Sequence, residues 1–266
     1  TYGYAPLAPT IDDFILWVFR SAYEGFSNDT PGRNIQIDYS RWRDSKSSGA
    51  AMAVLAGRAE DALQITAALD NRSWTELLED DTFESIDLKI LSDLATGVSQ
   101  KAITPREVVE ADRRRQATFW YSGYEPLYTA IRSASELLAA IDAFDPSMAG
   151  FDDGLTKYAS EWSRIDGLYR QFVHAARSTE HTKPLEPLVA QVENFYSNKY
   201  VGPLATAWQV QVDSIDEWKS SAVPAQGAFF AQHVTPLVAK GKRVVVIISD
   251  ALRYEVAEEL ATKLRR

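Results

Sequence analysis

The sequence predicts a mostly α-helical protein that ends in the first β-α unit of a truncated α/β domain. Apolar residues recur at spacings of three and four over residues 155–176 and again over residues 185–195. This spacing is typical of long helices that pack along a seam. At residues 244–248 the pattern changes to five β-branched residues in a row. A run without a polar face is typical of a strand covered on both sides, as in a parallel sheet.

The composition narrows the class of protein. The chain has 266 residues, of which 45% are hydrophobic, so it can bury a sizeable core. Its formal net charge of −9 does not favour nucleic acid as the partner of the whole chain, although a local basic face stays open. The chain has no Cys, which excludes disulfides and thiolate metal sites. No apolar run reaches the ~18 residues of a membrane helix, so we expect a cytoplasmic protein without membrane contact.

Residues 1–150 are expected to form a helical region. Its first helix should begin after Thr10, because a Thr followed by Asp13 is a capping-box-like start. Another helix should begin at Thr104-Pro105-Arg106-Glu107, which places an N-cap Thr, a Pro and a Glu at their preferred positions. Helical spacing also covers residues 39–46, 50–69, 74–79 and 83–100 and a segment that ends at Ile141, while residues 26–34 resemble a loop.

The basic run Arg113–Arg115 closes the helix that begins at Pro105. Cations are favoured in the last turn of a helix, so we predict a solvated helix end at this run. Contact with a phosphate backbone or a partner protein is the alternative.

Residues 151–220 are expected to form a long antiparallel helix hairpin. Two seams of apolar residues are joined by a short polar turn at Ser178–Lys183, which favours antiparallel packing. Gly202-Pro203 should kink or interrupt the second arm. The aromatic seam positions are interpreted as core packing rather than as a cofactor site. The seam residues are Leu155, Tyr158, Trp162, Ile165, Tyr169, Phe172 and Ala176 in the first arm, and Leu185, Leu188, Val192 and Phe195 in the second.

Residues 221–240 are expected to form a linker and a connecting helix, and residues 241–266 the start of an α/β domain. A parallel strand needs neighbours on both edges, and no other stretch of the sequence has the pattern of a second buried strand. We therefore expect the chain to be the central fragment of a longer protein. Residues 244–248 should pair with another chain, pack on helices or change conformation, rather than stand as an isolated, solvated strand.

The stretch from Val244 to Glu255, Val-Val-Val-Ile-Ile-Ser-Asp-Ala-Leu-Arg-Tyr-Glu, resembles the opening of PglZ domains of the type A subfamily, which are found in bacterial BREX phage-defence systems. The helical region before it, including Phe119-Trp120-Tyr121, is similar to the region upstream of that domain. PglZ domains in turn resemble the alkaline-phosphatase superfamily. The resemblance implies an alkaline-phosphatase-like α/β domain with a two-metal site, commonly of zinc, that acts on phosphate esters.

Asp250 is the residue that matches the metal-binding Asp at the end of the superfamily's first strand. A hard carboxylate at a strand end can hold a divalent cation, which stabilises charge on a transferring phosphoryl group. The resemblance places the other ligands and the Thr or Ser nucleophile further along the parent protein, so we expect no catalytic residue within this chain. Many superfamily members carry Gly where this chain has Ala251. Apart from the resemblance, an Asp after an apolar strand is usually a helix N-cap.

Two functions stay open at this point. The resemblance implies the central helical part of a metal-dependent phosphatase or phosphodiesterase of a phage-defence complex, with other BREX-type defence proteins as partners. It places a divalent metal, most commonly zinc, in the intact parent, and we expect neither bound metal nor activity in this part alone. The alternative is a helical module that docks other proteins or nucleic acid. His174, His181 and His233 are too far apart in the sequence to suggest a metal site of their own.

Overall fold

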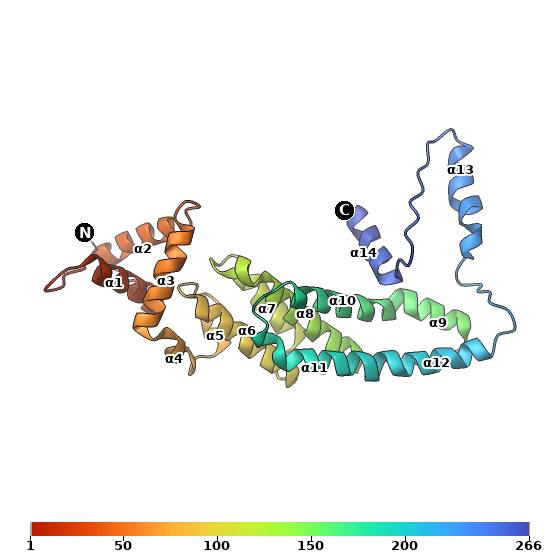
Figure 1. Ribbon diagram of the computed structural model, residues 1–266, viewed down its shortest axis with the longest axis horizontal. Helices are drawn as coiled ribbons and strands as arrows, with labels where there is room; N and C mark the ends of the chain where they lie inside the picture. Colours follow the sequence, from red (N-terminus) through yellow and green to blue (C-terminus); the bar gives the residue numbers. More distant parts are fainter. Residues whose placement is uncertain (1, 266) are drawn as a thin grey trace. The chain divides into compact units, whose positions relative to one another are not determined.

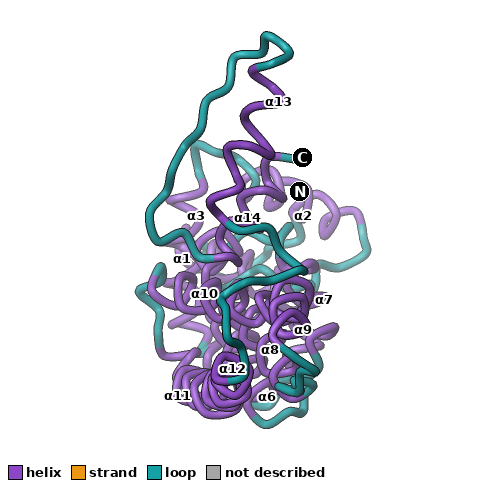
Figure 2. The backbone as a smooth tube through the Cα atoms, turned by 90° about the vertical axis from the view of Figure 1, so that its right-hand side faces the viewer, coloured by secondary structure: helices purple, strands orange, loops and turns teal. Residues whose placement is uncertain are grey.

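The computed structural model describes residues 2–265, and helices make up most of them (Figure 1, Figure 2). No strand is assigned within these residues. The prediction of a mostly α-helical protein is therefore confirmed. The chain divides into two compact units. The first holds the residues up to Ser135 together with His174–Leu188, and the second holds Glu136–Val173 together with the residues from Val189 onward.

The first unit is built from short helices. They are α1 (Ile11–Glu24), α2 (Thr30–Arg43), α3 (Gly49–Leu63), α4 (Ile65–Leu69), α5 (Trp74–Leu77), α6 (Glu84–Ser99), α7 (Pro105–Arg115), the N-terminal part of α8 (Tyr121–Asp142) and the short 3-10 helix η2 (Lys183–Leu185).

Local side chains determine where several of these helices begin. The Thr10 side chain accepts a hydrogen bond from the Asp13 backbone N–H, and Thr104 and Glu107 form a capping box, so both predicted starts are confirmed. The loop predicted at residues 26–34 is shorter than expected. The Asp29 side chain accepts from the Gly32 backbone N–H and caps α2, which therefore begins at Thr30.

Aromatic packing holds the N-terminal helices of the first unit together. Phe19 of α1 is fully buried. Its ring centroid lies 6.0 Å from Tyr39, 6.0 Å from Trp42 and 5.9 Å from Phe83. One phenyl ring therefore joins α1, α2 and the residue that precedes α6, and such aromatic pairs stabilise a core beyond the area that they bury.

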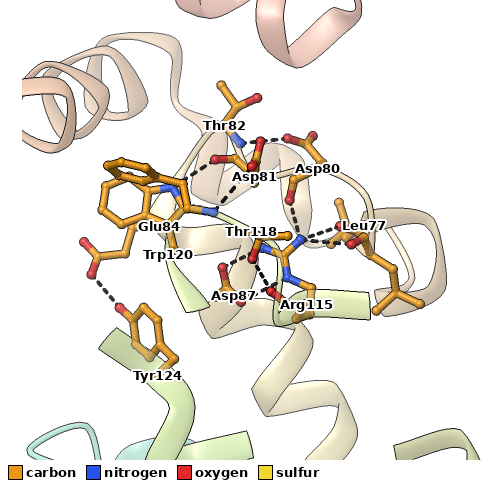
Figure 3. Close-up of polar contacts among 12 residues, drawn as sticks. Leu77, Asp80, Asp81, Thr82, Glu84, Asp87, Arg115, Thr118, Trp120 and Tyr124 are labelled. Carbon is orange, nitrogen blue, oxygen red and sulfur yellow. Dashed lines mark hydrogen bonds and ion pairs between the residues drawn. The ribbon is translucent and has the colours of Figure 1, made fainter. Parts of the chain in front are cut away.

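A fully buried ion pair lies at the end of α7. It corrects the prediction of a solvated helix end at Arg113–Arg115 for Arg115 alone, since the side chains of Arg113 and Arg114 are 67% and 35% exposed. Arg115 and Asp87 are both 0% exposed. The Arg115 guanidinium donates from Nε and Nη2 to the two carboxylate oxygens of Asp87, at 3.1 and 2.6 Å (Figure 3). Its Nη1 donates to the backbone carbonyls of Leu77, Leu78 and Asp80. Every part of the cation is satisfied by protein, so it needs neither water nor phosphate.

The second unit holds most of two helical segments that lie side by side in Figure 1, and only residues 174–188, where the segments are joined, belong to the first unit. The first segment is α9 (Phe151–Lys157), the π-helical turn η1 (Tyr158–Trp162) and α10 (Ser163–Arg177). The second is α11 (Glu186–Asn194), the π-helical turn η3 (Phe195–Val201) and α12 (Gly202–Asp213). The segment stays helical at Gly202-Pro203, where a kink or an interruption was predicted, and changes there from a π-helical turn to an α-helix. The short helices η4 (Gln226–Ala228), η5 (Phe230–Val234) and α13 (Thr235–Val238) follow, and α14 (Tyr254–Leu264) comes last.

Ring contacts show that the two segments run in opposite directions. Phe151 stacks on Trp208 at 5.0 Å between ring centroids, and Tyr169 stacks on Tyr196 at 3.7 Å. Between them, the Tyr200 hydroxyl donates to the Trp162 carbonyl at 3.0 Å. The predicted seam positions Trp162, Ile165 and Phe172 are buried, as periodic apolar positions on packed helices should be.

The predicted strand at residues 244–248 is not formed, which corrects the predicted β-α unit. These residues belong to the loop between α13 and α14 (Figure 2). Val245, Ile247 and Ile248 are 79%, 88% and 91% exposed. The reason is that a strand needs a hydrogen-bonded neighbour, and none of the described residues provides one. Of the three expected outcomes, pairing, packing on helices or a change of conformation, the structure shows the last, because the run is a solvated loop rather than an isolated strand.

The ion pair between Arg115 and Asp87 provides the first prediction. Replacing Arg115 by Met should lower the free energy of unfolding by about 3–5 kcal/mol, because it leaves the Asp87 carboxylate buried without its cation. Urea unfolding followed by circular dichroism measures this change. Arg113→Met is the matched control, since Arg113 is exposed and pairs only with Glu110 on its own helix, and it should cost less than about 0.5 kcal/mol. Equal effects of the two substitutions would contradict the assignment.

Candidate functional site

Asp250, the predicted metal ligand, lies in the loop that precedes α14. Its side chain is exposed, and its Oδ1 accepts a hydrogen bond from the Ala251 backbone N–H at 3.0 Å. Ala251 has φ +54°, in the left-handed region that favours glycine. The sequence resemblance places Gly at this position in many superfamily members. The loop thus has, next to Asp250, a conformation that Gly would adopt without strain.

A divalent metal finds no complete ligand set in the described part of the chain. No group of three or more His, Asp or Glu side chains within it is placed to hold an ion, and the three histidines form no such group. Asp250 therefore supplies at most one ligand of the two-metal site that the resemblance implies, and such a site needs several. The described residues by themselves do not fit that site.

The structure instead brings together a buried carboxylate and three tyrosines in the second unit, and we call this set the Asp166 cluster. Asp166 of α10 is 6% exposed. Tyr158 donates its hydroxyl to Oδ2 at 2.6 Å, and Tyr196 donates to Oδ1 at 2.6 Å. The Tyr200 hydroxyl lies 3.5 Å from Oδ2. A carboxylate can be buried in a helical seam only when its oxygens are satisfied in this way.

The cluster changes the acidity of its tyrosines. Burial raises the pKa of Tyr200 well above its usual range, and the negative charge of Asp166 raises it further. Burial followed by hydrogen bonding to Asp166 raises the pKa values of Tyr158 and Tyr196 in the same direction. The three phenols therefore remain neutral at physiological pH, and Asp166 keeps Tyr158 and Tyr196 as hydrogen-bond donors.

An open cavity of about 470 Å³ lies beside the Asp166 cluster. Its walls are mainly aromatic and aliphatic, and Asp166 and Arg253 supply its charged groups. A cavity that is mainly apolar with a few converging polar groups is the usual form of a binding pocket. Besides the cluster, the lining includes Leu155, Trp162, Leu204 and Trp208.

Arg253 connects the Asp166 cluster to the loop that carries Asp250. Its Nη2 lies 3.8 Å from Asp166 Oδ1, and its Nε lies 2.9 Å from Glu255 Oε1. Glu255 is 5% exposed, and its carboxylate oxygens accept no hydrogen bond from any described residue. Arg253 itself remains more than half exposed, so it reaches inward from the surface to two buried acids.

Two further contacts hold α14 against the first segment of the second unit. The Tyr254 ring lies edge-on to Tyr158 at 6.0 Å between centroids. Arg170 of α10 forms an ion pair with Glu259, and Lys263 pairs with the same carboxylate at 2.8 Å. Both contacts lie in the first two turns of α14.

The Asp166 cluster was not predicted from the sequence, although the spacing of its residues was a signal. Asp166 follows Trp162 by four residues and Tyr158 by eight, so it lies on the predicted seam. Tyr196 and Tyr200 have the same spacing of four in the opposite segment. A lone acid on an aromatic seam, facing tyrosines in the next helix, is the pattern that indicates a buried hydrogen-bonded carboxylate.

Comparison with known proteins finds similarity to alkaline-phosphatase-like proteins. Residues 229–266 match the family described as the BREX system PglZ alkaline phosphatase-like domain. The chain is 27% identical over 281 residues to the "Alkaline phosphatase-like protein PglZ" of Bacillus cereus (strain H3081.97), covering 99% of the chain and 33% of that relative. It is 33% identical over 227 residues to the "Alkaline phosphatase-like protein BrxZ" of Escherichia coli O9:H4 (strain HS), covering 78% of the chain and 25% of that relative.

These matches confirm the resemblance to PglZ proteins of the BREX system. The chain spans about a quarter to a third of the length of these two relatives. No solved structure matches it. Among the described residues, no helix is both long enough and apolar enough to cross a membrane.

Tyr200→Phe tests the Asp166 cluster. The substitution removes one hydroxyl that donates to the Trp162 carbonyl and faces Asp166, and we expect it to lower the free energy of unfolding by about 1 kcal/mol. Chemical denaturation measures the change. Tyr169→Phe is the matched control, because it keeps the stacked ring and loses an exposed hydrogen bond to Glu193. A larger effect at Tyr169 than at Tyr200 would contradict the cluster.

Proposed function

We propose that this protein is a phage-defence component whose alkaline-phosphatase-like domain hydrolyses phosphate esters with the help of bound divalent metal, most commonly zinc. The single observation that supports this proposal is the match of residues 229–266 to the PglZ alkaline-phosphatase-like domain. That segment contains the motif from Val244 to Glu255 on which the sequence resemblance rests.

In this proposal Asp250 supplies one carboxylate ligand to the metal site. Its exposure and its place in a loop leave the second carboxylate oxygen free to bind an ion. The remaining ligands and the nucleophile belong to parts of the protein outside these 266 residues, so this chain alone should be inactive. The same outside parts would provide the neighbours with which residues 244–248 form a strand and, with α14, a β-α unit.

The helical part serves as the support for this domain. We propose four segments: a helical region at 1–150, a long antiparallel hairpin at 151–220, a linker with a connecting helix at 221–240, and the start of the phosphatase-like domain at 241–266. The opposed ring contacts of Phe151 with Trp208 and Tyr169 with Tyr196 support the hairpin.

A second candidate function is docking of other proteins of the defence system. The second segment of the hairpin exposes apolar side chains: Val189, Val201 and Val210 are 49%, 41% and 60% exposed. Exposed apolar side chains favour a protein as the partner. The net charge of −9 disfavours binding to nucleic acid. Other BREX-type proteins are the partners that this candidate implies.

The proposed enzyme function predicts a metal-dependent activity of the full-length protein. Turnover of p-nitrophenyl phosphate with added zinc or manganese should fall by at least about a hundredfold in Asp250→Ala, because a metal ligand is lost. The 266-residue chain alone should show no turnover. Asp213→Ala is the matched control, since Asp213 is an exposed acid near the end of α12. Activity of this chain that depends on Asp250, or full activity of the Asp250→Ala protein, would overturn the proposal.

The docking candidate predicts a loss of association. Replacing Val189, Val201 and Val210 together by Glu should prevent the full-length protein from purifying with the other proteins of its defence system, because charges would enter an apolar interface. Val54→Glu is the control, since Val54 is 57% exposed on α3. Unchanged association of the triple variant would exclude this surface as the docking site.

A further inference from the structure

The open cavity of about 470 Å³ in the second unit has an aromatic lining. Its volume lies within the range of small-molecule sites, roughly 300–1,000 Å³. The hydroxyls of Tyr158 and Tyr196 are used by Asp166, and the Tyr200 hydroxyl donates to the Trp162 carbonyl. A ligand therefore meets mainly ring surface rather than free phenol groups. The aromatic residues that line the cavity are Tyr158, Trp162, Tyr196, Tyr200 and Trp208.

Two of these rings are held in place by rings outside the cavity. Phe151 stacks on Trp208 at 5.0 Å between centroids, and Tyr169 stacks on Tyr196 at 3.7 Å. Trp208 also lies close against Gly154 of α9, where a Cβ atom would come within 2.9 Å of the indole. Both rings are thus fixed before a ligand arrives, and a preorganised site loses less conformational entropy on binding.

Phe144 supports two further rings of the lining. It meets Trp162 edge-on at 5.7 Å and Tyr200 edge-on at 4.9 Å between centroids. Trp162 and Tyr200 are buried, whereas Tyr196 and Trp208 are partly exposed. The aromatic lining is therefore fixed by packing and still open to solvent on part of its surface.

The charges at the cavity favour a cationic ligand. Asp166 and Glu255 are 6% and 5% exposed, and Arg253 forms an ion pair with each of them. Two carboxylates that share one guanidinium leave a net negative charge beside the rings. The faces of aromatic rings also carry the negative end of the ring quadrupole and attract cations. An anionic ligand would be repelled by both.

The lining is suited to an organic cation rather than to a metal ion. No group of three or more His, Asp or Glu side chains among the described residues is placed to hold a metal ion. The cavity offers ring faces and aliphatic side chains instead. Such surfaces bind a cation whose charge is spread over apolar groups and whose hydration is weak.

We propose that this cavity binds an organic cation of the quaternary ammonium class. The ring faces contact its methyl groups, and the Asp166 carboxylate attracts its charge. Arg253 competes with this ligand, because it is a cation of the same chain that reaches to 3.8 Å from Asp166 while more than half exposed. The site depends only on contacts within the second unit and is independent of the proposed phosphatase activity.

Three small probes of nearly the same shape test the charge preference on the unchanged 266-residue chain. They are choline, its neutral analogue 3,3-dimethyl-1-butanol and the anionic 3,3-dimethylbutanoate, each titrated by NMR. Choline should bind about tenfold more tightly than the alcohol, and the carboxylate should bind most weakly. Equal affinities, a preference for the carboxylate, or no saturable binding of choline would each rule out the proposal.

A quaternary ammonium group occurs both in free small molecules and in trimethylated lysine side chains of proteins. A peptide with one trimethyl-lysine, compared with the same peptide carrying unmodified lysine, separates these sources. Methylation-dependent binding that is tighter than that of choline assigns the site to a modified protein. Choline binding at least as tight as that of the methylated peptide assigns it to a small molecule.

Substitutions in the lining test which residues act. Trp208→Leu should weaken choline binding about tenfold, because a ring face is lost. Trp74→Leu is the matched control, since Trp74 is a half-buried tryptophan of α5 in the first unit.

Arg253→Met should tighten choline binding about threefold, because it removes the competing cation. Arg243→Met, at an exposed arginine of the preceding loop, should leave the affinity unchanged. Circular dichroism shows whether each variant is folded, and the comparison of the three probes needs no variant. Weaker choline binding in a folded Arg253→Met chain, or equal effects of Trp208→Leu and Trp74→Leu, contradicts the site.

Discussion

The second unit depends on one buried carboxylate. Asp166 lies in the first of the unit's two long helical segments, and tyrosine hydroxyls from both segments donate to it. A buried carboxylate without hydrogen bonds would destabilise an apolar seam. Asp166 therefore sets how the two segments meet, because any other register would leave its charge buried and unsatisfied. The same carboxylate faces Arg253. The packing of the helices and the placement of the loop after the apolar run are therefore linked through a single side chain.

Residues 244–248 have a clear local pattern for a strand but no neighbouring strand among the described residues. Five β-branched residues favour a strand, yet hydrogen bonds to a neighbouring strand are what form one. With no neighbour among the described residues, the apolar side chains remain exposed. Exposed β-branched runs readily pair with other chains. The segment is therefore stable only where the rest of a sheet is present, which agrees with relatives that extend well beyond the region matched by this chain.

The sequence was sufficient where the cause is local. The helix starts at Thr10 and Thr104 depend on residues within one turn, and both were predicted. The buried acids were not predicted, because their partners are distant in the chain: Arg115 meets Asp87 across 28 residues, and Tyr196 meets Asp166 across 30. Arg115 does share a face with the buried Val108 and Ala111 at helical spacing, so its burial left a trace in the sequence. Asp87 likewise shares a face with the buried Ile90, Leu91 and Leu94, so the missing information is which buried residues pair with each other.

The two buried acids differ in a way that bears on their roles. Asp87 receives a bidentate arginine that is itself 0% exposed, together with the Tyr128 hydroxyl, so every group is permanently enclosed. Asp166 receives tyrosine hydroxyls at close range, but its cation lies 3.8 Å away and reaches in from solvent. Enclosing a guanidinium fully suits a framework that never opens. A half-exposed one can be released at lower cost, which suits a contact between a helix and the loop that carries Asp250.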